Sequence, residues 1–215
     1  MLFRSIRDAA LWAESRPVHR AGPAQTFPIV HFERTLLLRE SYAGDSAGLA
    51  FAIALASSFS EDPGNARAAV TGAVHPNGTI RAVGGVGAKI RAAADAGFHF
   101  VVIPSQNANT IYELDAATLL GIQVIAVNDA DKALPFLTVS GDGGIFLSSV
   151  TTLFWAAVHL LCEGESEIAS GVLDSLISRV PAHLTALRVR EIFADVSPAP
   201  LPEPLARLCE NIPQK

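Results

Sequence analysis

The sequence is poor in cysteine and in charge. Its 215 residues include only two cysteines, Cys162 and Cys209, which lie far apart and lack the spacing of metal ligands. Charged residues make up 17% of the chain, and 16 Lys and Arg against 21 Asp and Glu give a formal net charge of −5. We therefore expect no disulfide framework, and no nucleic-acid partner either, because a negatively charged chain repels phosphates.

The sequence also lacks a targeting signal and a membrane span. The N-terminal segment, MLFRSIRDAALWAESRP, contains no apolar stretch of the signal-peptide type. The longest apolar run, residues 145–162, is interrupted by serine, threonine and histidine, which favours a buried helix of a soluble protein. These absences predict a cytoplasmic protein with no membrane partner.

Metal and cofactor sites have no support in the sequence. The six histidines show no metal-ligand spacing. The glycine-rich segment GGVGAK at 84–89 lacks the Gly-Lys-Ser/Thr ending of a phosphate-binding loop. We therefore predict no metal and no cofactor.

Hydrophobic residues, by contrast, make up 50% of the chain, enough for one sizeable core. Short Val/Ile-rich segments alternate with Ala-rich ones up to about residue 140, which predicts an α+β domain over residues 1–140. The expected helices are 5–15, 46–59, 84–96, 109–114 and 131–136, and the expected strands are 35–38, 98–103 and 122–127. Two further strands, 68–74 and 79–83, flank Asn77-Gly78 and predict a β-hairpin.

The last third of the sequence changes character. Gly141, Gly143 and Gly144 predict a linker, and apolar residues then recur at helical spacing, which predicts a helical C-terminal extension over residues 145–215. The pattern AxxLLxxGExExA at 157–169, followed by a Leu-rich helix, resembles a tetratricopeptide helix pair. A single pair cannot bury its own apolar faces, so we expect this tail to pack on its own domain or on a neighbouring subunit.

One short motif indicates a nucleophile. The segment Gly44-Asp45-Ser46-Ala47-Gly48 matches the G-x-S-x-G pattern of serine hydrolases with a nucleophile elbow. An esterase of that type needs several strands before the elbow and a catalytic histidine after it. Only one strand is expected before Ser46, and the only histidines after residue 100, His159 and His183, fall in the helical tail. The esterase interpretation is therefore the weaker one.

A longer pattern gives a more specific interpretation. Five blocks follow one another in order: AGDSAG at 43–48, VTGAV at 70–74, the Asn-Gly hairpin, VGGVGAKIRAAADAG at 83–97 and VVIPSQN at 101–107. This set resembles the proteolytic domain of the Lon protease family, and the resemblance covers residues 34–137. The residues of its motifs are most similar to those of the archaeal, class B branch. The resemblance implies a fold like domain 2 of the ribosomal protein S5 superfamily and a homo-oligomer. The implied activity is that of a serine endopeptidase acting on unfolded proteins or peptides.

The resemblance also implies the roles of three residues. Ser46 would be the nucleophile, Lys89 the general base, and Thr71 a hydroxyl that helps to hold the lysine. The residues themselves agree with this chemistry, because apolar neighbours around Lys89 favour a neutral amine. Backbone N–H groups at a helix start beside Ser46, with small neighbours, suit an oxyanion and a substrate backbone, and we assign that role to Gly44, Asp45 and Ala47.

The sequence departs from the family in three respects. Its 215 residues hold no Walker sequence and leave no room for the ATP-driven unfolding module, so we expect an ATP-independent, stand-alone peptidase. Ala73 and Ala88 stand where family members often carry acidic residues. These changes leave open a second hypothesis, in which a weakly active or inactive scaffold binds a protein partner, such as a separate unfoldase, through its helical tail.

Overall fold

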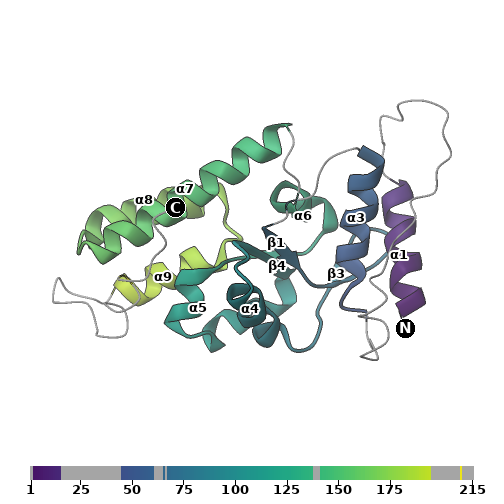
Figure 1. Ribbon diagram of the computed structural model, residues 1–215, viewed down its shortest axis with the longest axis horizontal. Helices are drawn as coiled ribbons and strands as arrows, with labels where there is room; N and C mark the ends of the chain where they lie inside the picture. The colour runs from purple at the N-terminus through teal and green to yellow at the C-terminus, as the bar shows by residue number, and fades with distance from the viewer. Residues whose placement is uncertain are drawn as a thin grey trace.

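A three-stranded parallel sheet lies at the centre of the molecule, with helices on both faces (Figure 1). The computed structural model describes residues 2–15, 45–60, 65, 67–137, 141–194 and 209. The sheet has the order β1-β4-β5 and consists of β1 (Ala68–Val70), β4 (Phe100–Pro104) and β5 (Gln123–Val127). A separate antiparallel hairpin pairs β2 (Ala73–Val74) with β3 (Ile80–Arg81).

Of the helices that the structure describes, two precede the first strand, and further helices lie between β3 and β4, between β4 and β5, and after β5. They are α1 (Leu2–Ser15), α3 (Gly48–Ser60), α4 (Val86–Asp95), the 3-10 helix η1 (Ser105–Glu113), α5 (Ala116–Gly121), α6 (Ala130–Leu137), α7 (Gly141–Cys162), α8 (Ser166–Arg179) and α9 (Leu184–Ala194). Among the described residues, no helix is long and apolar enough to cross a membrane. The mixture of helices with a parallel sheet confirms the predicted α+β class.

The sheet separates the apolar core into two layers. Every residue of β4 and β5 is buried, as expected for strands covered on both faces. Phe100 and Val102 pack with α1, α3, α6, α7 and α8 on one face, whereas Val101 and Ile103 pack with α4, η1 and α5 on the other. Helix α9 contributes to both layers, with Ala186 and Val189 in the first and Leu184 and Ile192 in the second. The period-two alternation of β4 therefore supplies both layers.

The predicted hairpin is present but shorter than expected. Gly78 has a φ of +90°, the left-handed conformation that the Asn-Gly turn predicts. The expected strand 68–74, however, is divided: β1 pairs in parallel with β4, and only β2 belongs to the hairpin. The chain changes sheets at Gly72, where a Cβ atom would lie 2.9 Å from Ile80 Cγ2. A single long strand was therefore wrong, because the close approach at Gly72 redirects the chain.

The glycine-rich linker was also predicted wrongly. Gly141, Gly143 and Gly144 lie in the first turns of α7. Leu147 and Val150, further along α7, are buried in the larger core layer, and their burial favours a helix that extends back over the glycines. The sequence reasoning also missed the short helix α5, and the expected strand 35–38 lies outside the described residues.

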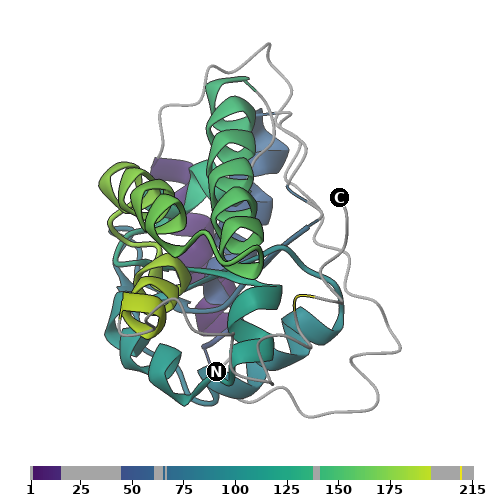
Figure 2. The ribbon, with the colours of Figure 1, turned by 90° about the vertical axis from the view of Figure 1, so that its left-hand side faces the viewer.

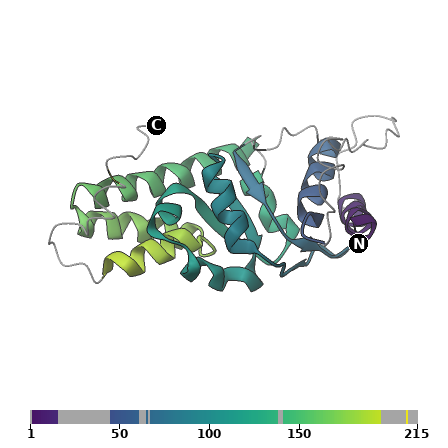
Figure 3. The ribbon, with the colours of Figure 1, turned by 60° about the horizontal axis from the view of Figure 1, so that its bottom comes forward.

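The helical tail packs on the rest of its own chain. This is one of the two arrangements expected from the sequence, the other being packing on a neighbouring subunit. Helices α7 and α8 lie side by side (Figure 2), and both contribute to the core layer shared with α1, α3 and α6. Figure 3 shows α1 and α3 at one end of the molecule and α7, α8 and α9 at the other. The proposed boundary between 140 and 145 and the tetratricopeptide resemblance stay predictions.

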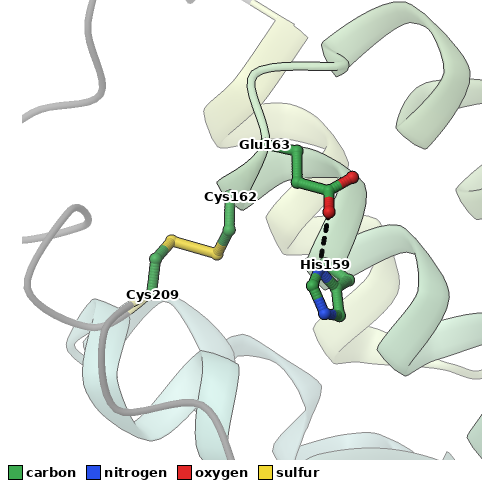
Figure 4. The surroundings of a disulfide bond; sticks show 4 residues. All are labelled: His159, Cys162, Glu163 and Cys209. Carbon is green, nitrogen blue, oxygen red and sulfur yellow. Dashed lines mark ion pairs between the residues drawn. A yellow bond between two sulfur atoms is a disulfide. The ribbon is translucent and has the colours of Figure 1, made fainter. Parts of the chain in front are cut away.

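The two cysteines are joined, which corrects the expectation drawn from their separation in sequence. Cys162, at the end of α7, forms a disulfide with Cys209, and their Cα atoms lie 5.5 Å apart (Figure 4). An ion pair between His159 of α7 and Glu163, in the turn directly after α7, lies beside the disulfide. Distance along the chain failed as a guide, because residues separated by 47 positions can lie next to each other in the fold.

Candidate functional site

Ser46 lies in the turn Asp45–Ala47, directly before α3, and its side chain is partly exposed. Its carbonyl oxygen accepts a hydrogen bond from the Gly72 N–H at 3.0 Å, and the Leu49 N–H donates to the Gly72 carbonyl at 2.9 Å. These bonds join the start of α3 to the segment between β1 and β2. Gly44, the other predicted neighbour of Ser46, lies outside the described residues.

The last glycine of the G-x-S-x-G motif has a packing role. Gly48 begins α3, and a Cβ atom there would lie only 3.2 Å from the backbone nitrogen of Val74 and 3.5 Å from Val74 Cγ1. The absence of a side chain lets the start of α3 approach β2 closely. Gly48 therefore helps to fix the turn that carries Ser46.

Thr71 connects the other two predicted residues. Its side chain is buried and its N–H donates to the Val102 carbonyl at 3.0 Å, so the parallel sheet holds its backbone. The Lys89 Nζ donates to Thr71 Oγ1 at 3.2 Å, and Thr71 Oγ1 in turn donates to the Ser46 carbonyl, also at 3.2 Å. The structure thus brings Ser46, Thr71 and Lys89 together from three separate segments of the chain.

Lys89 lies in the first turns of α4 and is partly buried. Burial lowers the pKa of its ammonium group, because removal from water disfavours the charged form. Within the described part of the chain, Lys89 forms no ion pair that would oppose this effect. The environment of Lys89 therefore favours the neutral amine that a base requires.

The backbone donors beside Ser46 are only partly available. The Gly48 N–H donates to the Asp45 carbonyl at 3.0 Å, and the Leu49 N–H is already bonded to Gly72. The first N–H groups of α3 are therefore occupied, contrary to the expectation that the helix start itself would serve an oxyanion. The assignment of the oxyanion donors to Gly44, Asp45 and Ala47 stays a prediction.

Sequence reasoning missed Asn107, which it quoted as part of a motif without a role. The Asn107 amide forms two hydrogen bonds with the backbone of Val83, just before the glycine turn that leads into α4. The available signal was its position directly after the buried strand β4. That position could not reveal the partner, because an amide bonds any backbone group within reach.

Neither histidine of the tail is arranged for an esterase. His183 is fully buried, and its Nδ1 accepts from the Ala186 N–H while its Nε2 contacts Gln123 Oε1. His159 pairs with Glu163, directly after the end of α7. Both rings are engaged elsewhere, which removes support from the elbow-type hydrolase.

Comparison with known proteins agrees with this geometry. The family model described as the Lon protease C-terminal proteolytic domain matches residues 41–139. This segment is similar to a Lon proteolytic domain. It contains Ser46, Thr71, Lys89 and Asn107, and its bounds agree with the span 34–137 over which the sequence resembles the family.

Archaeal and bacterial Lon proteases are similar to this segment. The archaeal Lon protease of Thermoplasma volcanium is 36% identical over 101 residues, which cover 47% of this chain and 15% of the relative. Lon protease 1 of Thermus thermophilus is 34% identical over 94 residues, 44% of this chain and 12% of the relative. The archaeal Lon protease of Methanocaldococcus jannaschii is 31% identical over 118 residues, 54% of this chain and 17% of the relative. The chain thus spans less than a fifth of these relatives, and the matches include the predicted archaeal Lon proteases.

Proposed function

We propose that this chain is a Lon-like serine endopeptidase that uses Ser46 and Lys89 as a catalytic dyad. The observation that carries the proposal is the hydrogen-bonded connection from Lys89 Nζ through Thr71 Oγ1 to the Ser46 carbonyl. It ties the lysine to the residue whose side chain it would activate. The protease names of the family model and of the relatives support the same reaction.

In this mechanism a neutral Lys89 accepts the proton of the Ser46 hydroxyl as Oγ attacks the scissile carbonyl carbon. The N–H groups of the Asp45–Ala47 turn donate to the oxyanion that forms. Lys89 then returns the proton to the leaving amine, and water hydrolyses the acyl-enzyme with Lys89 again as the base. The lone pair of the amine is available for this role because Thr71 accepts one of its N–H groups.

The substrates, partners and location are proposed with the activity. We expect cleavage of unfolded proteins or peptides without ATP, by a homo-oligomer in the cytoplasm, with a separate unfoldase as its partner. The inactive scaffold is the weaker alternative. In that hypothesis the helical tail binds the protein partner. The apolar faces of the tail instead contribute to the chain's own core.

The test is cleavage of unfolded casein by single and double variants. Ser46→Ala and Lys89→Met should each abolish cleavage while the far-UV spectrum stays unchanged, and the double variant should be no worse, because residues of one catalytic unit are not additive. Activity should rise with pH as Lys89 loses its proton, with a midpoint below the usual lysine value because burial lowers its pKa. Lys132→Met is the matched control, since Lys132 is exposed and bonds Asn128. Retention of most activity by Lys89→Met would contradict the dyad.

A further inference from the structure

The helix that carries Lys89 is attached through a turn that has little conformational restraint of its own. Gly84 and Gly85 are exposed, and a Cβ atom at either position would meet nothing within 4 Å. Gly85 has a φ of +67° and precedes α4 without a side-chain cap. Two adjacent glycines sample many backbone conformations, so contacts outside the turn have to fix the start of α4.

Side chains from the start of η1 supply these contacts on the upstream side of the turn. Asn107 Oδ1 accepts from the Val83 N–H at 3.0 Å, and Asn107 Nδ2 donates to the Val83 carbonyl at 3.1 Å. Gln106 Oε1 accepts from the Ala82 N–H at 2.9 Å. The two amides thus bond consecutive residues much as a neighbouring strand would.

The same segment also contacts α4 on the downstream side. A Cβ atom at Gly87 would lie 3.2 Å from Thr110 Cγ2, so α4 and η1 are in close contact there. Arg91 Nη1 donates to the Glu113 carbonyl at 3.5 Å. Because η1 follows directly after the fully buried strand β4, it is a rigid reference for both sides of the glycine turn.

We propose that Asn107 is a positioning residue for Lys89: its two hydrogen bonds to Val83 fix the glycine turn and thereby hold the amine of Lys89 against Thr71. This inference rests on the proposed function, in which Lys89 is the base. Among the described residues, Asn107 forms hydrogen bonds with Val83 and not with Ser46 or Lys89, so its effect on the reaction passes through the glycine turn and the first turn of α4. Asn107 thereby gains the role that its motif alone did not reveal.

Kinetics provide the first test. Asn107→Ala should lower kcat on casein by about 10-fold to 100-fold, the loss expected when a reacting group is displaced by about 1 Å, and should leave KM unchanged. The pH midpoint of activity should move upward, since a loosened α4 exposes Lys89 to water. Asn109→Ala is the matched control, because Asn109 is an exposed asparagine of the same 3-10 helix. If Asn107→Ala changes only the melting temperature, with kcat and the pH midpoint as in the natural chain, the proposal is overturned.

A second measurement does not depend on activity. The chain has only three lysines, so the titration of Lys89 can be followed by NMR of labelled lysine side chains. Asn107→Ala should shift this titration toward higher pH, whereas Asn109→Ala should not. An inactive natural chain whose Lys89 titration responds in this way would refute the peptidase and keep the positioning role. An unchanged titration would refute that role.

A milder variant covers the case in which Asn107→Ala does not fold. Asn107→Asp keeps the oxygen that accepts from the Val83 N–H and loses the donor to the Val83 carbonyl. It should show the same directions of change in kcat and in the Lys89 titration, by smaller amounts. Values equal to those of Asn109→Ala in both measurements would overturn the proposal.

Discussion

A threonine hydroxyl can accept one hydrogen bond and donate another, and Thr71 uses both capacities. It accepts from Lys89 and donates to the Ser46 carbonyl, so its orientation is fixed although the hydroxyl itself is small. A valine of the same shape would fill the same space but could neither hold the amine nor bond the carbonyl. The residue type at position 71 thus carries information that its burial alone does not.

His183 is the other residue whose environment dictates its protonation. It is completely buried, its ring stacks on Phe154 at 5.4 Å, and its Nδ1 accepts from the Ala186 N–H at the start of α9. Burial lowers the pKa of His183 to about 3. The neutral ring therefore carries its proton on Nε2 and donates it to Gln123 Oε1 at 3.1 Å.

We expect His183 to make folding sensitive to acid. Its stabilising contribution is complete above about pH 6.5, the unfolded value, and is lost as the pH falls toward 3, because only the unfolded chain binds the proton in that range. The free energy of unfolding should fall by at most about 1.4 kcal/mol per pH unit from this group. Urea unfolding at pH 7 and pH 5, followed by tryptophan fluorescence, measures the slope.

The matched variants separate His183 from the other titrating groups. His183→Asn keeps an acceptor for the Ala186 N–H and should flatten the dependence on pH. His159→Asn, which removes an exposed histidine of α7, should keep it. An identical slope in both variants would contradict the assignment to His183.

The site residues differ in how far the sequence could predict them. Ser46, Thr71 and Lys89 were identified from a family resemblance, and the structure brings them together. The sequence could not indicate that the Leu49 N–H is already bonded to the Gly72 carbonyl, because that partner depends on where the turn between β1 and β2 lies. Asn107 was missed for the same reason: hydrogen-bond partners are set by the tertiary fold.

At the scale of elements, the residues before α9 complete the central sheet. The Ala126 N–H of the edge strand β5 donates to the Ala182 carbonyl at 3.0 Å. The Val124 N–H donates to Thr185 Oγ1 at 2.8 Å, and that hydroxyl donates to the Ile122 carbonyl at 3.2 Å. Segment 182–185 therefore covers an edge that would otherwise expose unpaired backbone groups.

Thr185 provides a test of this role. Thr185→Val keeps the shape of the side chain but leaves the Val124 N–H and the Ile122 carbonyl without their buried partner, which should lower the free energy of unfolding by about 1–3 kcal/mol. Thr152→Val is the matched control, since the Thr152 hydroxyl is exposed and bonds only Ser148 of its own helix. A chain ending at Gly141 should aggregate or change its oligomeric state, because it loses this cover and 12 of the 31 described residues that are buried in the larger core layer. Equal stability of the two threonine variants, together with a soluble truncated chain, would show that the tail is a separate module.

The elements themselves were predicted unevenly, for physical reasons. Helix α4 and strands β4 and β5 were expected within a few residues, because their apolar periods and flanking glycines agree with the fold. The predicted strand 68–74 was longer than the observed one, because the β propensity of its residues continues across Gly72, where the chain changes sheets. The glycines of α7 were assigned to a linker because local propensity gave no measure of the burial that follows them.

At the scale of the whole molecule, the Cys162–Cys209 disulfide connects the end of α7 with a residue 47 positions further along the chain. The closed loop contains α8 and α9 and therefore the cover of β5. Protein disulfides persist in oxidising compartments and are rare in the cytosol. The bond is thus at variance with the cytoplasmic location inferred from the sequence, and fractionation of the producing cells would decide between them.

Reduction should measurably weaken the fold. In the chain-entropy description, opening a loop of this size lowers the free energy of unfolding by about 2–4 kcal/mol. The midpoint of urea unfolding should therefore fall when a dithiol is added. The double variant Cys162→Ser/Cys209→Ser should start at the lower value and not respond. Free thiols titrated in the unreduced native protein would contradict the bond.

The hydrogen bond from the Thr71 N–H to the Val102 carbonyl sets an order of events during synthesis. A ribosome releases Ser46 well before it releases β4. Until β4 is available, Thr71 lacks its backbone partner Val102, and η1, which follows β4, cannot fix the start of α4. Under the proposed function, a nascent chain therefore carries its nucleophile without a base and cannot cut the unfolded polypeptides around it. Proteolysis would begin only when non-local pairing is complete, so the topology would act as a safeguard that needs no inhibitory propeptide.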